Sequence, residues 1–366
     1  MYIHQRNQWP QFLWDNDTLI SIIGEVRNLQ GKVLGKMEAI GFKLRDEASL
    51  EMLSKDVLKS SEIEGEIFEL DEVRSSVARH LGMEISGLIP SDRNVDGMVE
   101  MILDATQNHT DELNEKRLFS WHSSLFSSGK SGLYKIIVGN WRDDSTGPMQ
   151  VVSGALGKEK VHFEAPSASK VPKEMEVFFN WVNTEKNLDP VIKAAIAHFW
   201  FLTIHPFEDG NGRIARAISD SLIARAEGVS QRFYSFSTQI RIERKVYYAV
   251  LEKTQRGDLD ITLWISWFLN CLKNAIKAAD ETLAKVLFKH DFWNKNAKTV
   301  LNSRQVLILN KLMDGFEGKL NTSKWAKIAK CSADTALRDI QDLIKKEILK
   351  KVEAGGRSTN YELINF

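Results

Sequence analysis

The stretch that decides the fold is KAAIAHFWFLTIHPFEDGNGRIARAISDSLI, residues 193–223. Its first part, 193–204, is almost entirely apolar, which is typical of a helix buried at the centre of a bundle. The second part repeats apolar residues at helical spacing, at Ile214, Ala217, Ile218, Leu222 and Ile223. The sequence therefore predicts two packed helices, the first ending at Ile204 and the second beginning near Gly212.

The turn between these helices, HPFEDGNGRIAR at 205–216, is more polar than a helix connection requires. The N-terminus of the second helix offers free N–H groups and a positive dipole end to an anion, and the glycines allow a ligand to approach the backbone closely. Arg213 and Arg216 lie on one helix face and can bind phosphate oxygens. Asp209 can hold a divalent cation, and His205 can accept a proton near neutral pH. These parts together suit transfer from a nucleoside triphosphate.

The composition is that of an ordinary globular protein large enough for two or three domains, with 366 residues, 43% hydrophobic and 27% charged. Forty-nine basic residues balance forty-nine acidic ones, so the overall charge predicts no polyanion partner, although this does not exclude a local patch. Cys271 and Cys331 are too far apart for a Cys-x-x-Cys pair. The start, MYIHQRNQWPQF, does not resemble a signal peptide, and no apolar run is long enough to span a membrane. We expect a cytoplasmic protein.

Few prolines and long stretches of 3.6-residue periodicity predict a mainly α fold. Helices are expected over 15–40, 44–64, 69–81, 116–126, 172–185, 193–204 and 259–276, with a loop at 82–94. The segments YKIIVGNWR, MQVVSG and KVHFEAP, between 134 and 166, are short and β-prone, and they predict one hairpin or small sheet. We divide the chain into four parts: an N-terminal helical region (1–90), a main domain (91–275), a linker helix (276–302) and a C-terminal domain (303–366).

The C-terminal domain resembles a winged helix-turn-helix. Three helical segments, SRQVLILNKLM, NTSKWAKIAKC and SADTALRDIQDLIKKEI, precede two short strands. Ser332 is a good N-cap for the third helix, and Gly355-Gly356-Arg357 would form the tip of the wing hairpin.

This domain has a modest basic patch that is compatible with DNA phosphates. The patch balances basic residues against four acids, for a local net charge of +5: Lys319, Lys324, Lys327, Lys330, Arg338, Lys345, Lys346, Lys350 and Lys351 against Asp334, Asp339, Asp342 and Glu347. Asp334, Asp339 and Asp342 fall among the polar positions of the third helix, where they would repel a DNA backbone. The pattern therefore favours target docking or homodimer contacts over DNA binding.

The turn matches the Fic-family signature H-x-F-x-[DE]-G-N-G-R-x-x-R at every specified position, and the resemblance covers roughly residues 90–275. Most members are adenylyltransferases, which move AMP from ATP to a protein hydroxyl. The resemblance implies a role for each motif residue: His205 as general base, Phe207 as a core anchor, Asp209 as the Mg²⁺ ligand, Asn211 and the Gly210 and Gly212 amides at the α-phosphate, and Arg213 and Arg216 at the β- and γ-phosphates. The related Doc-like kinases carry lysine near position 212, so nucleotidyl transfer is favoured over phosphorylation.

Two further segments resemble parts of the family. Val161, His162, Phe163 and Glu164 resemble its flap, a hairpin that clamps the target segment by strand addition. The alternative is a structural hairpin that covers the core. Tyr247 and Gln255 match positions on the adenosine side of the nucleotide, although taken alone Tyr247 is expected in the core and Gln255 at the surface.

Residues 60–66, SSEIEGE, match the family's inhibitory motif [ST]-x-x-x-E-[GN] at Ser60, Glu64 and Gly65. The resemblance implies that Glu64 occupies the Arg216 guanidinium, which would otherwise hold the γ-phosphate. The alternative is a solvated acidic face made of Glu62, Glu64, Glu66 and Glu69.

The sequence thus predicts a Fic-type helical bundle with a β-hairpin flap and a C-terminal winged helix. The expected activity is Mg²⁺- and ATP-dependent adenylylation of a Tyr, Thr or Ser hydroxyl, on a target protein or on the chain itself, with autoinhibition by Glu64. Two alternatives remain open. One is a DNA-binding regulator whose Fic core senses a ligand, and the other is a transferase that uses a different phosphodiester donor.

Overall fold

The computed structural model describes residues 1–39, 42–83, 87–145, 147–154, 158, 160–313, 316, 318–352 and 359–364, with the backbone alone at 42, 43 and 281. The chain forms two compact units, Met1–Asp280 and Glu281–Phe366. In the described part of the chain, no helix combines the length and apolar character needed to cross a membrane.

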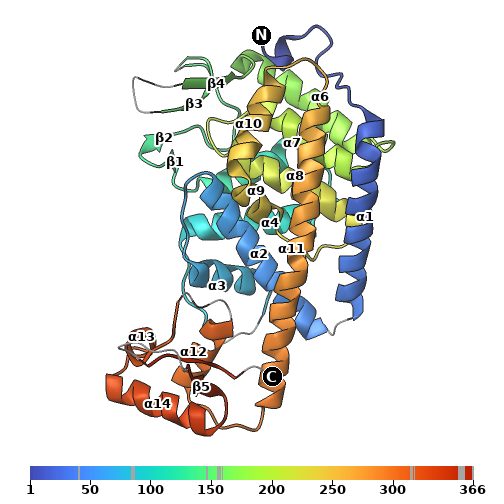
Figure 1. The fold of residues 1–366 in the computed structure, drawn as a ribbon. Helices are drawn as coiled ribbons and strands as arrows, with labels where there is room; N and C mark the ends of the chain where they lie inside the picture. The colour runs from blue at the N-terminus through green and yellow to red at the C-terminus, as the bar shows by residue number, and fades with distance from the viewer. Residues whose placement is uncertain are drawn as a thin grey trace. The chain divides into compact units, whose positions relative to one another are not determined.

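The first unit is a helical bundle (Figure 1). Its helices are η1 (Ile3–Gln5), α1 (Asn16–Ala39), α2 (Phe42–Ile63), α3 (Leu70–His80), α4 (Arg93–Gln107), α5 (Glu115–Leu125), η2 (Ala168–Lys170), α6 (Val171–Thr184), α7 (Pro190–Ile204), α8 (Asn211–Glu227), α9 (Phe236–Ile242) and α10 (Arg244–Gln255). The last helix to start in this unit, α11 (Thr262–Lys295), continues past its end.

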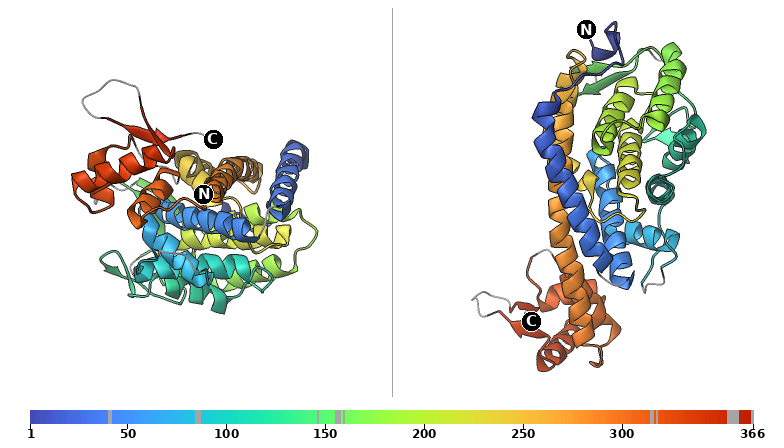
Figure 2. Two further views of the ribbon diagram at one scale, coloured as in Figure 1. Left: turned by 90° about the horizontal axis from the view of Figure 1, so that it is seen from below. Right: turned by 90° about the vertical axis from the view of Figure 1, so that its right-hand side faces the viewer.

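Helices α7 and α8 form the centre of this unit, as the sequence predicted. Every residue from 194 to 204 is buried, and so is nearly all of α8 up to Ala224. Asp189 begins α7 by accepting a hydrogen bond from the Val191 N–H at 2.9 Å, next to a proline in the first turn. Figure 2 shows these helices enclosed by the rest of the unit, with α1 on the outside. The connection between α7 and α8 is therefore held between two well-packed helices.

The predictions around the main domain need two corrections. The predicted loop at 82–94 ends earlier, because Asp92 caps α4 by accepting from the Asn94 N–H at 2.8 Å. The sequence analysis predicted no helix at the position of α4. The apolar helix predicted at 259–276 begins at Thr262, whose N–H bonds to Asp260, and continues to Lys295.

The β-prone region forms two separate two-stranded antiparallel sheets instead of one. Strands β1 (Lys130–Ser131) and β2 (Tyr134–Lys135) pair, as do β3 (Gln150–Ser153) and β4 (Lys160–Glu164).

Most of YKIIVGNWR does not form a strand, because its N–H groups bond elsewhere. The N–H of Ile137 donates to Glu208 Oε2 at 2.7 Å, that of Gly139 to His122 Nδ1 at 3.1 Å, and that of Arg142 to the Pro206 carbonyl at 3.0 Å. This segment thus supports the 205–209 turn.

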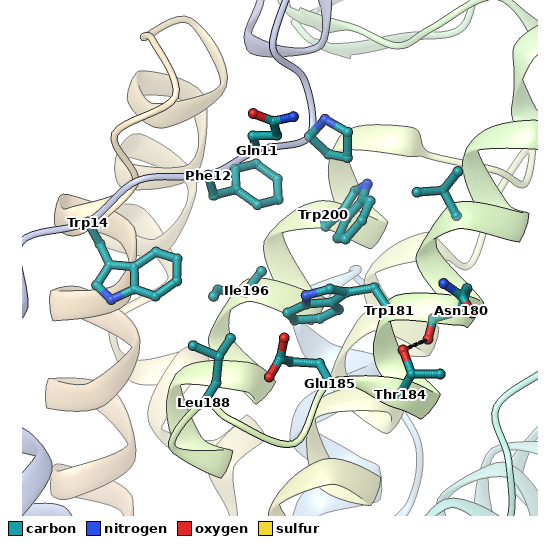
Figure 3. Close-up of a pocket in the computed structure, with 12 residues that line it drawn as sticks. Gln11, Phe12, Trp14, Asn180, Trp181, Thr184, Glu185, Leu188, Ile196 and Trp200 are labelled. Carbon is teal, nitrogen blue, oxygen red and sulfur yellow. Dashed lines mark hydrogen bonds between the residues drawn. The ribbon is translucent and has the colours of Figure 1, made fainter.

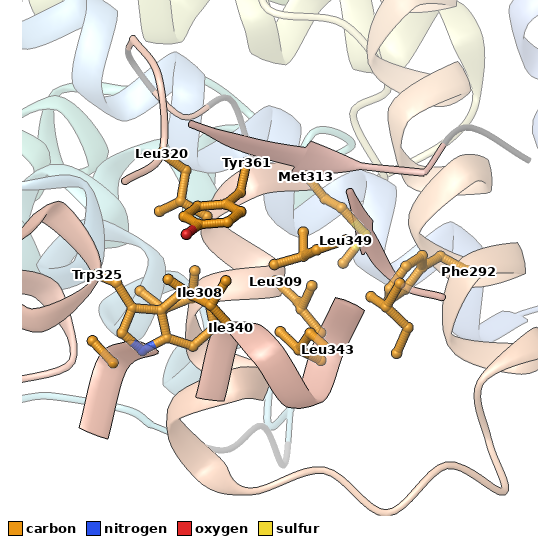
Figure 4. Packing of buried hydrophobic residues seen from close by; sticks show 12 residues of the cluster. Phe292, Ile308, Leu309, Met313, Leu320, Trp325, Ile340, Leu343, Leu349 and Tyr361 are labelled. Carbon is orange, nitrogen blue, oxygen red and sulfur yellow. The ribbon is translucent and has the colours of Figure 1, made fainter. Parts of the chain in front are cut away.

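The second unit contains the three predicted helices, α12 (Ser303–Met313), α13 (Thr322–Ile328) and α14 (Ala333–Lys345). They are followed by an antiparallel pair, β5 (Leu349–Lys351) and β6 (Tyr361–Leu363). Ser332 caps α14 as predicted, accepting from the Thr335 N–H at 3.2 Å. Ile308, Trp325, Ile340 and Tyr361 pack into one apolar core (Figure 4). The predicted wing tip, Gly355-Gly356-Arg357, lies outside the described residues.

The structure corrects the expected position of one acid on α14, Asp339, and pairs a second, Asp342, with a lysine. Asp339 is buried beside Ile340, and its carboxylate pairs with Arg304 Nε at 2.7 Å. Asp342 pairs with Lys346 and accepts from Gln305 Nε2 at 2.7 Å. Both carboxylates are therefore neutralised by side chains of this unit instead of projecting as bare negative charges.

One close approach generates a stability prediction. A Cβ on Gly97 of α4 would lie 1.9 Å from the carbonyl oxygen of Ser124, at the contact between α4 and α5. We expect Gly97→Ala to lower the unfolding free energy by roughly 1–3 kcal/mol or more, because the backbone must move. Gly24→Ala in α1 is the matched control, since its Cβ meets nothing within 4 Å; removing a helix-interior glycine should stabilise by roughly 0.5–1 kcal/mol. Urea denaturation of both variants measures this, and equal effects would contradict the contact.

Candidate active site

His205 ends α7 in the left-handed conformation, with φ 51° and ψ 59°. Arg142 Nε donates to its carbonyl at 2.7 Å, which holds this strained residue in place. The Nδ1–H of His205 donates to the Leu202 carbonyl at 3.2 Å, which leaves Nε2 as the nitrogen able to accept a proton. Burial lowers the pKa of His205 to about 4. The imidazole is therefore neutral, and basic at Nε2, across the physiological pH range.

Asn211 shapes the turn with its side-chain amide. Its Oδ1 accepts from the Phe207 N–H at 3.0 Å, and its Nδ2 donates to the Phe207 carbonyl at 2.8 Å. Phe207 is fully buried. The family resemblance implied that Asn211 contacts the α-phosphate. In the structure, both ends of its side-chain amide bond to the turn. Its backbone N–H, at the N-terminus of α8, is the group that can contact an anion.

His122 of α5 supports the turn from below, and sequence reasoning missed it. Its ring stacks on Phe207 with centroids 4.2 Å apart. Nδ1 accepts from the Gly139 N–H at 3.1 Å, so the proton lies on Nε2, which donates to the Asp209 carbonyl at 3.2 Å. Burial lowers the pKa of His122 to about 4. A lone histidine on an amphipathic helix carries no sequence signal for this contact.

The N-terminus of α8 is an anion site that a carboxylate occupies. The first intrahelical bond of α8 runs from the Ile214 N–H to the Gly210 carbonyl, so the N–H groups at 211–213 precede the helical ladder. A Cβ on Gly212 would lie 2.1 Å from Glu64 Oε1. The Glu64 carboxylate therefore lies directly against the backbone where an anion would bind.

All three guanidinium nitrogens of Arg216 bond to Ser60 of α2 or to Glu64, which directly follows that helix. The Nε of Arg216 donates to Ser60 Oγ at 2.8 Å, one terminal nitrogen to the Ser60 carbonyl at 2.9 Å, and the other to Glu64 Oε1 at 2.8 Å. The side chain is 1% exposed. Burial alone would lower the pKa of Arg216, but Glu64, Tyr247 and Tyr248 hold it above its usual value. Arg216 is thus a buried cation that needs a neighbouring anion.

Arg213 is held by a second carboxylate, that of Glu66, at 2.7 Å. Its guanidinium also lies over the Phe126 ring, 4.8 Å from the centroid. The turn after α2 makes both contacts fit, because Gly65 adopts φ +91° and the Glu66 N–H bonds back to the Ser61 carbonyl. We call Glu64 and Glu66 together the carboxylate latch.

The sequence analysis gave Glu66 no role in the site and named it only as part of a solvated acidic face. Glu62, by contrast, has its ion pairs outside the site. It pairs with Lys59 at 2.6 Å and with Arg241 at 3.4 Å. The signal that could have separated them is the glycine between Glu64 and Glu66, which turns both side chains the same way.

Asp209 is half-exposed beside the turn, with its Oδ1 accepting from the Gly210 N–H at 2.6 Å and its Oδ2 accepting from Ser131 Oγ. No cluster of three or more His, Cys, Asp or Glu side chains suited to a metal occurs among the residues that the structure describes. Mg²⁺ is commonly bound by one or two carboxylates together with substrate phosphates, so a single carboxylate beside an anion site fits that ion.

The hairpin β3–β4 carries the residues predicted as the flap. Phe163 is buried against the rings of Tyr2 and His4, so it anchors the hairpin instead of facing a ligand. His162 Nδ1 pairs with Glu252 at 2.7 Å. Arg256 donates to the carbonyls of Val161 and His162, and the Glu164 carbonyl accepts from His4 Nε2 at 2.9 Å. These contacts tie β4 to the core of the unit.

Tyr247 and Gln255 are both buried on α10. Tyr247 bonds to His198 Nε2 at 3.1 Å, which agrees with its core interpretation. Gln255 is 3% exposed and donates to Thr203 Oγ1 at 3.3 Å, so the surface interpretation of this residue was wrong. It lies at the end of α10 with its side chain turned inward to α7.

A surface groove with many aromatic residues lies elsewhere in the first unit (Figure 3). Phe12, Trp14, Trp181 and Trp200 line it, from the N-terminal segment, α6 and α7. None of its lining residues belongs to the 205–216 turn or to the carboxylate latch.

Comparison with known proteins agrees with the motif. Residues 112–223 match the family model described as Fic/DOC family, a narrower span than the 90–275 expected from the motif, and residues 2–83 match one described as a domain of unknown function, DUF4172. The central part of the chain, which carries the 205–216 turn, is thus similar to the Fic/DOC family.

Several named relatives share this domain. The protein adenylyltransferase fic-1 of Caenorhabditis elegans is 28% identical over 200 residues, which cover 54% of this chain and 35% of the relative. The protein adenylyltransferase Fic of Nematostella vectensis is 31% identical over 115 residues, covering 31% and 25%. The chain thus spans about a third of the length of such relatives.

Solved structures show the same fold. A Fic family protein from Desulfovibrio desulfuricans superposes with a TM-score of 0.53 at 20% identity, covering 95% of this chain and 96% of the other. A Fic domain containing signaling protein from Bacteroides thetaiotaomicron gives a TM-score of 0.52 at 20% identity, covering 71% and 98%. The mainly helical Fic fold predicted from the sequence is confirmed.

The buried histidines predict how stability depends on pH. Burial lowers the pKa of His122 to about 4 and that of His198 to about 3 from 6.5, so the unfolded chain binds these protons first. Their contribution is present above pH 6.5 and is lost as the pH falls towards these values, at ~1.4 kcal/mol per pH unit for each histidine. Urea denaturation between pH 7.5 and 5 should show this loss. His198→Gln should reduce the slope of unfolding free energy against pH by the contribution of one histidine. An unchanged slope would contradict the assignment.

Proposed function

We propose that this protein is a nucleotidyltransferase that adenylylates a protein hydroxyl with ATP. The observation that carries the proposal is a neutral histidine base beside a helix N-terminus where two buried arginines gather around an anion site. The relatives named protein adenylyltransferase support the same activity.

The chemistry follows from the side chains. The Nε2 of His205 takes the proton of the target hydroxyl, and that oxygen attacks the α-phosphorus of ATP. The bond from the α-phosphorus to the bridging oxygen breaks, and pyrophosphate leaves. The N–H groups at 211–213 bind the α-phosphate oxygens, where negative charge gathers in the transition state. Arg213 and Arg216 bind the β- and γ-phosphates, which both orients ATP and stabilises the leaving group.

Asp209 would hold Mg²⁺ together with the ATP phosphates. The ion would supply charge neutralisation of the phosphates. Ser131 and the Gly210 N–H already orient the Asp209 carboxylate, so the chain prepares this ligand before ATP binds.

The acceptor is a Tyr, Thr or Ser hydroxyl of a target protein or of the chain itself. The hairpin β3–β4 would receive the target segment as an added strand. Because β4 is tied to α10 and to the N-terminal segment, β3 is the strand whose edge would pair with the target.

The carboxylate latch would inhibit the enzyme in cis. Both arginines that would bind the β- and γ-phosphates have acidic partners from the segment after α2, and Glu64 also lies on the backbone of the anion site. ATP bound beside the latch would be displaced, and displacement near 1 Å costs about 10²-fold in rate. Two carboxylates therefore make the inhibition more complete than Glu64 alone.

A different phosphodiester donor is the second candidate, because the phosphate-binding groups do not read the base. Tyr247 and Gln255 already bond within the protein. Transfer from ATP, UTP and CTP, each radiolabelled at the α-phosphate, in a cell lysate separates these donors; label from CTP or UTP in preference to ATP would overturn the adenylyl assignment.

His205→Ala tests the base. We expect it to reduce transfer by roughly 10²–10⁴-fold, because the attacking hydroxyl loses its proton acceptor, while nucleotide binding is retained. Measurements of transfer rate and of ATP affinity by calorimetry distinguish these effects. Both proteins, with and without His205→Ala, should also carry Glu64→Gly, so that the anion site is accessible to ATP. Undiminished transfer by the variant would remove His205 from the mechanism.

Glu64→Gly tests the latch. Transfer should rise about 10²-fold over the unsubstituted protein, because Arg216 becomes available to the γ-phosphate. Glu64→Gly with Arg216→Ala should lose this gain. Quantifying AMP incorporation at saturating ATP gives the comparison.

Two neighbouring acids supply matched controls. Glu66→Gly should activate by a smaller factor, because it releases Arg213 alone, and should add to the effect of Glu64→Gly. Glu62→Gly should change little, since Glu62 pairs outside the site. Equal activation by Glu62→Gly and Glu66→Gly would mean that negative charge near the site, and not the specific contacts of the carboxylate latch, causes the inhibition.

A further inference from the structure

The neutral chain hides an asymmetric distribution of charge. Residues 281–366 contain sixteen basic and ten acidic residues, whereas residues 1–280 contain thirty-three and thirty-nine. The second unit thus carries a formal net charge of +6, and the first unit carries −6. A polyanion partner that the whole-chain balance did not predict is therefore compatible with the second unit taken by itself.

The outward face of α14 is less acidic than its sequence suggested. Asp339 is buried in its pair with Arg304, and Asp342 is paired with Lys346. The exposed residues of the helix are Ala333, Asp334, Leu337, Arg338, Gln341 and Lys345. Arg338 and Gln341 are three residues apart and so lie on one face.

Further cations lie on both sides of α14 in the chain. Lys319, Lys324, Lys327, Lys330, Lys350 and Lys351 are all exposed. Lys350 pairs with Glu362 at the surface, and Lys324 lies over the Phe316 ring. The exposed acids between 319 and 352 are Asp334 and Glu347. Within the described residues this segment is thus strongly cationic at its surface.

We propose that the exposed face of α14 binds double-stranded DNA in the major groove. The helix has 13 residues and a length of about 20 Å, and a helix of this kind fits the width of that groove. Arg338 can donate to guanine O6 and N7, and Gln341 can bond to adenine N6 and N7. The flanking lysines supply phosphate contacts, which provide affinity without sequence information.

The chemistry of the face favours DNA over a protein partner. Protein interfaces have apolar, often aromatic centres. Between 316 and 352, Leu337 is the exposed large hydrophobic residue in the described part of the chain, at 38% exposure. A single leucine beside Arg338 is too little for such a centre, but it can contact a thymine methyl group. The face therefore has the cationic and hydrogen-bonding side chains that groove binding needs, and it lacks the apolar centre that protein docking needs.

Binding of the full chain to a pool of random duplex DNA tests the proposal, with the His205→Ala variant as the protein so that transfer is suppressed. We expect binding that weakens linearly with the logarithm of salt concentration, and enrichment of a preferred sequence through rounds of selection. Lys327→Ala should weaken binding to all sequences and lower the salt slope by about 0.9. Arg338→Ala should reduce discrimination between selected and random duplexes by roughly ten- to a hundredfold.

Lys298→Ala is the matched control, because it removes an exposed positive charge of the same unit outside α13 and α14. It should leave the preference for the selected duplex unchanged. Three outcomes would overturn the proposal: no duplex binding at low salt, equal loss of discrimination in the Lys298 and Arg338 variants, or failure of selection to enrich any sequence. None of these outcomes depends on the transfer activity, since each one reports duplex binding alone.

Discussion

The pair of hydrogen bonds between the Asn211 side chain and the Phe207 backbone is the constraint on which the site depends. It closes the turn between two helices that are already packed, and it buries the Phe207 ring under the turn. His122 then fixes the same turn from the other side, through the ring of Phe207 and the carbonyl of Asp209. The histidine, the acid and the helix N-terminus thus keep their relative positions because one short segment is held at both ends.

Burial of Arg216 explains why the segment after α2 lies where it does. A guanidinium that is 1% exposed is costly unless an anion compensates it, and Ser60 with Glu64 satisfies all three of its nitrogens. The phosphates of a triphosphate also offer negatively charged oxygens that accept hydrogen bonds from a guanidinium. The protein fold therefore requires an anion at this position, and the proposed inhibition follows from the fact that two different anions suit it.

The helical fold could be predicted well from the sequence because its signals are local. The apolar run at 193–204 and the spacing after Gly212 define α7 and α8, and Ser332 defines the start of α14. The motif residues were recognisable because they are contiguous.

What could not be predicted depends on contacts between distant segments. His122 lies 87 residues from the carbonyl it supports, and Glu66 lies 147 residues from Arg213. YKIIVGNWR has β-prone residues, but its N–H groups bond to the 205–209 turn and to His122 instead of to a neighbouring strand. Asp339 looks polar in sequence, and only its pairing with Arg304 shows that it faces inward.

The covalent connection between α2 and the carboxylate latch has a quantitative consequence for the proposed inhibition. Because the two carboxylates belong to the same chain as the arginines, ATP would compete with an intramolecular ligand. The effective concentration of that ligand would depend on how firmly α2 is held in place. Such competition does not weaken on dilution of the protein. Arg244 donates to the Ile63 carbonyl at the end of α2, and Asp56 accepts from Ser235 further along it, so these remote contacts set that effective concentration. The ATP concentration needed to displace the carboxylate latch would thus depend on how α2 packs, at contacts away from the reacting atoms.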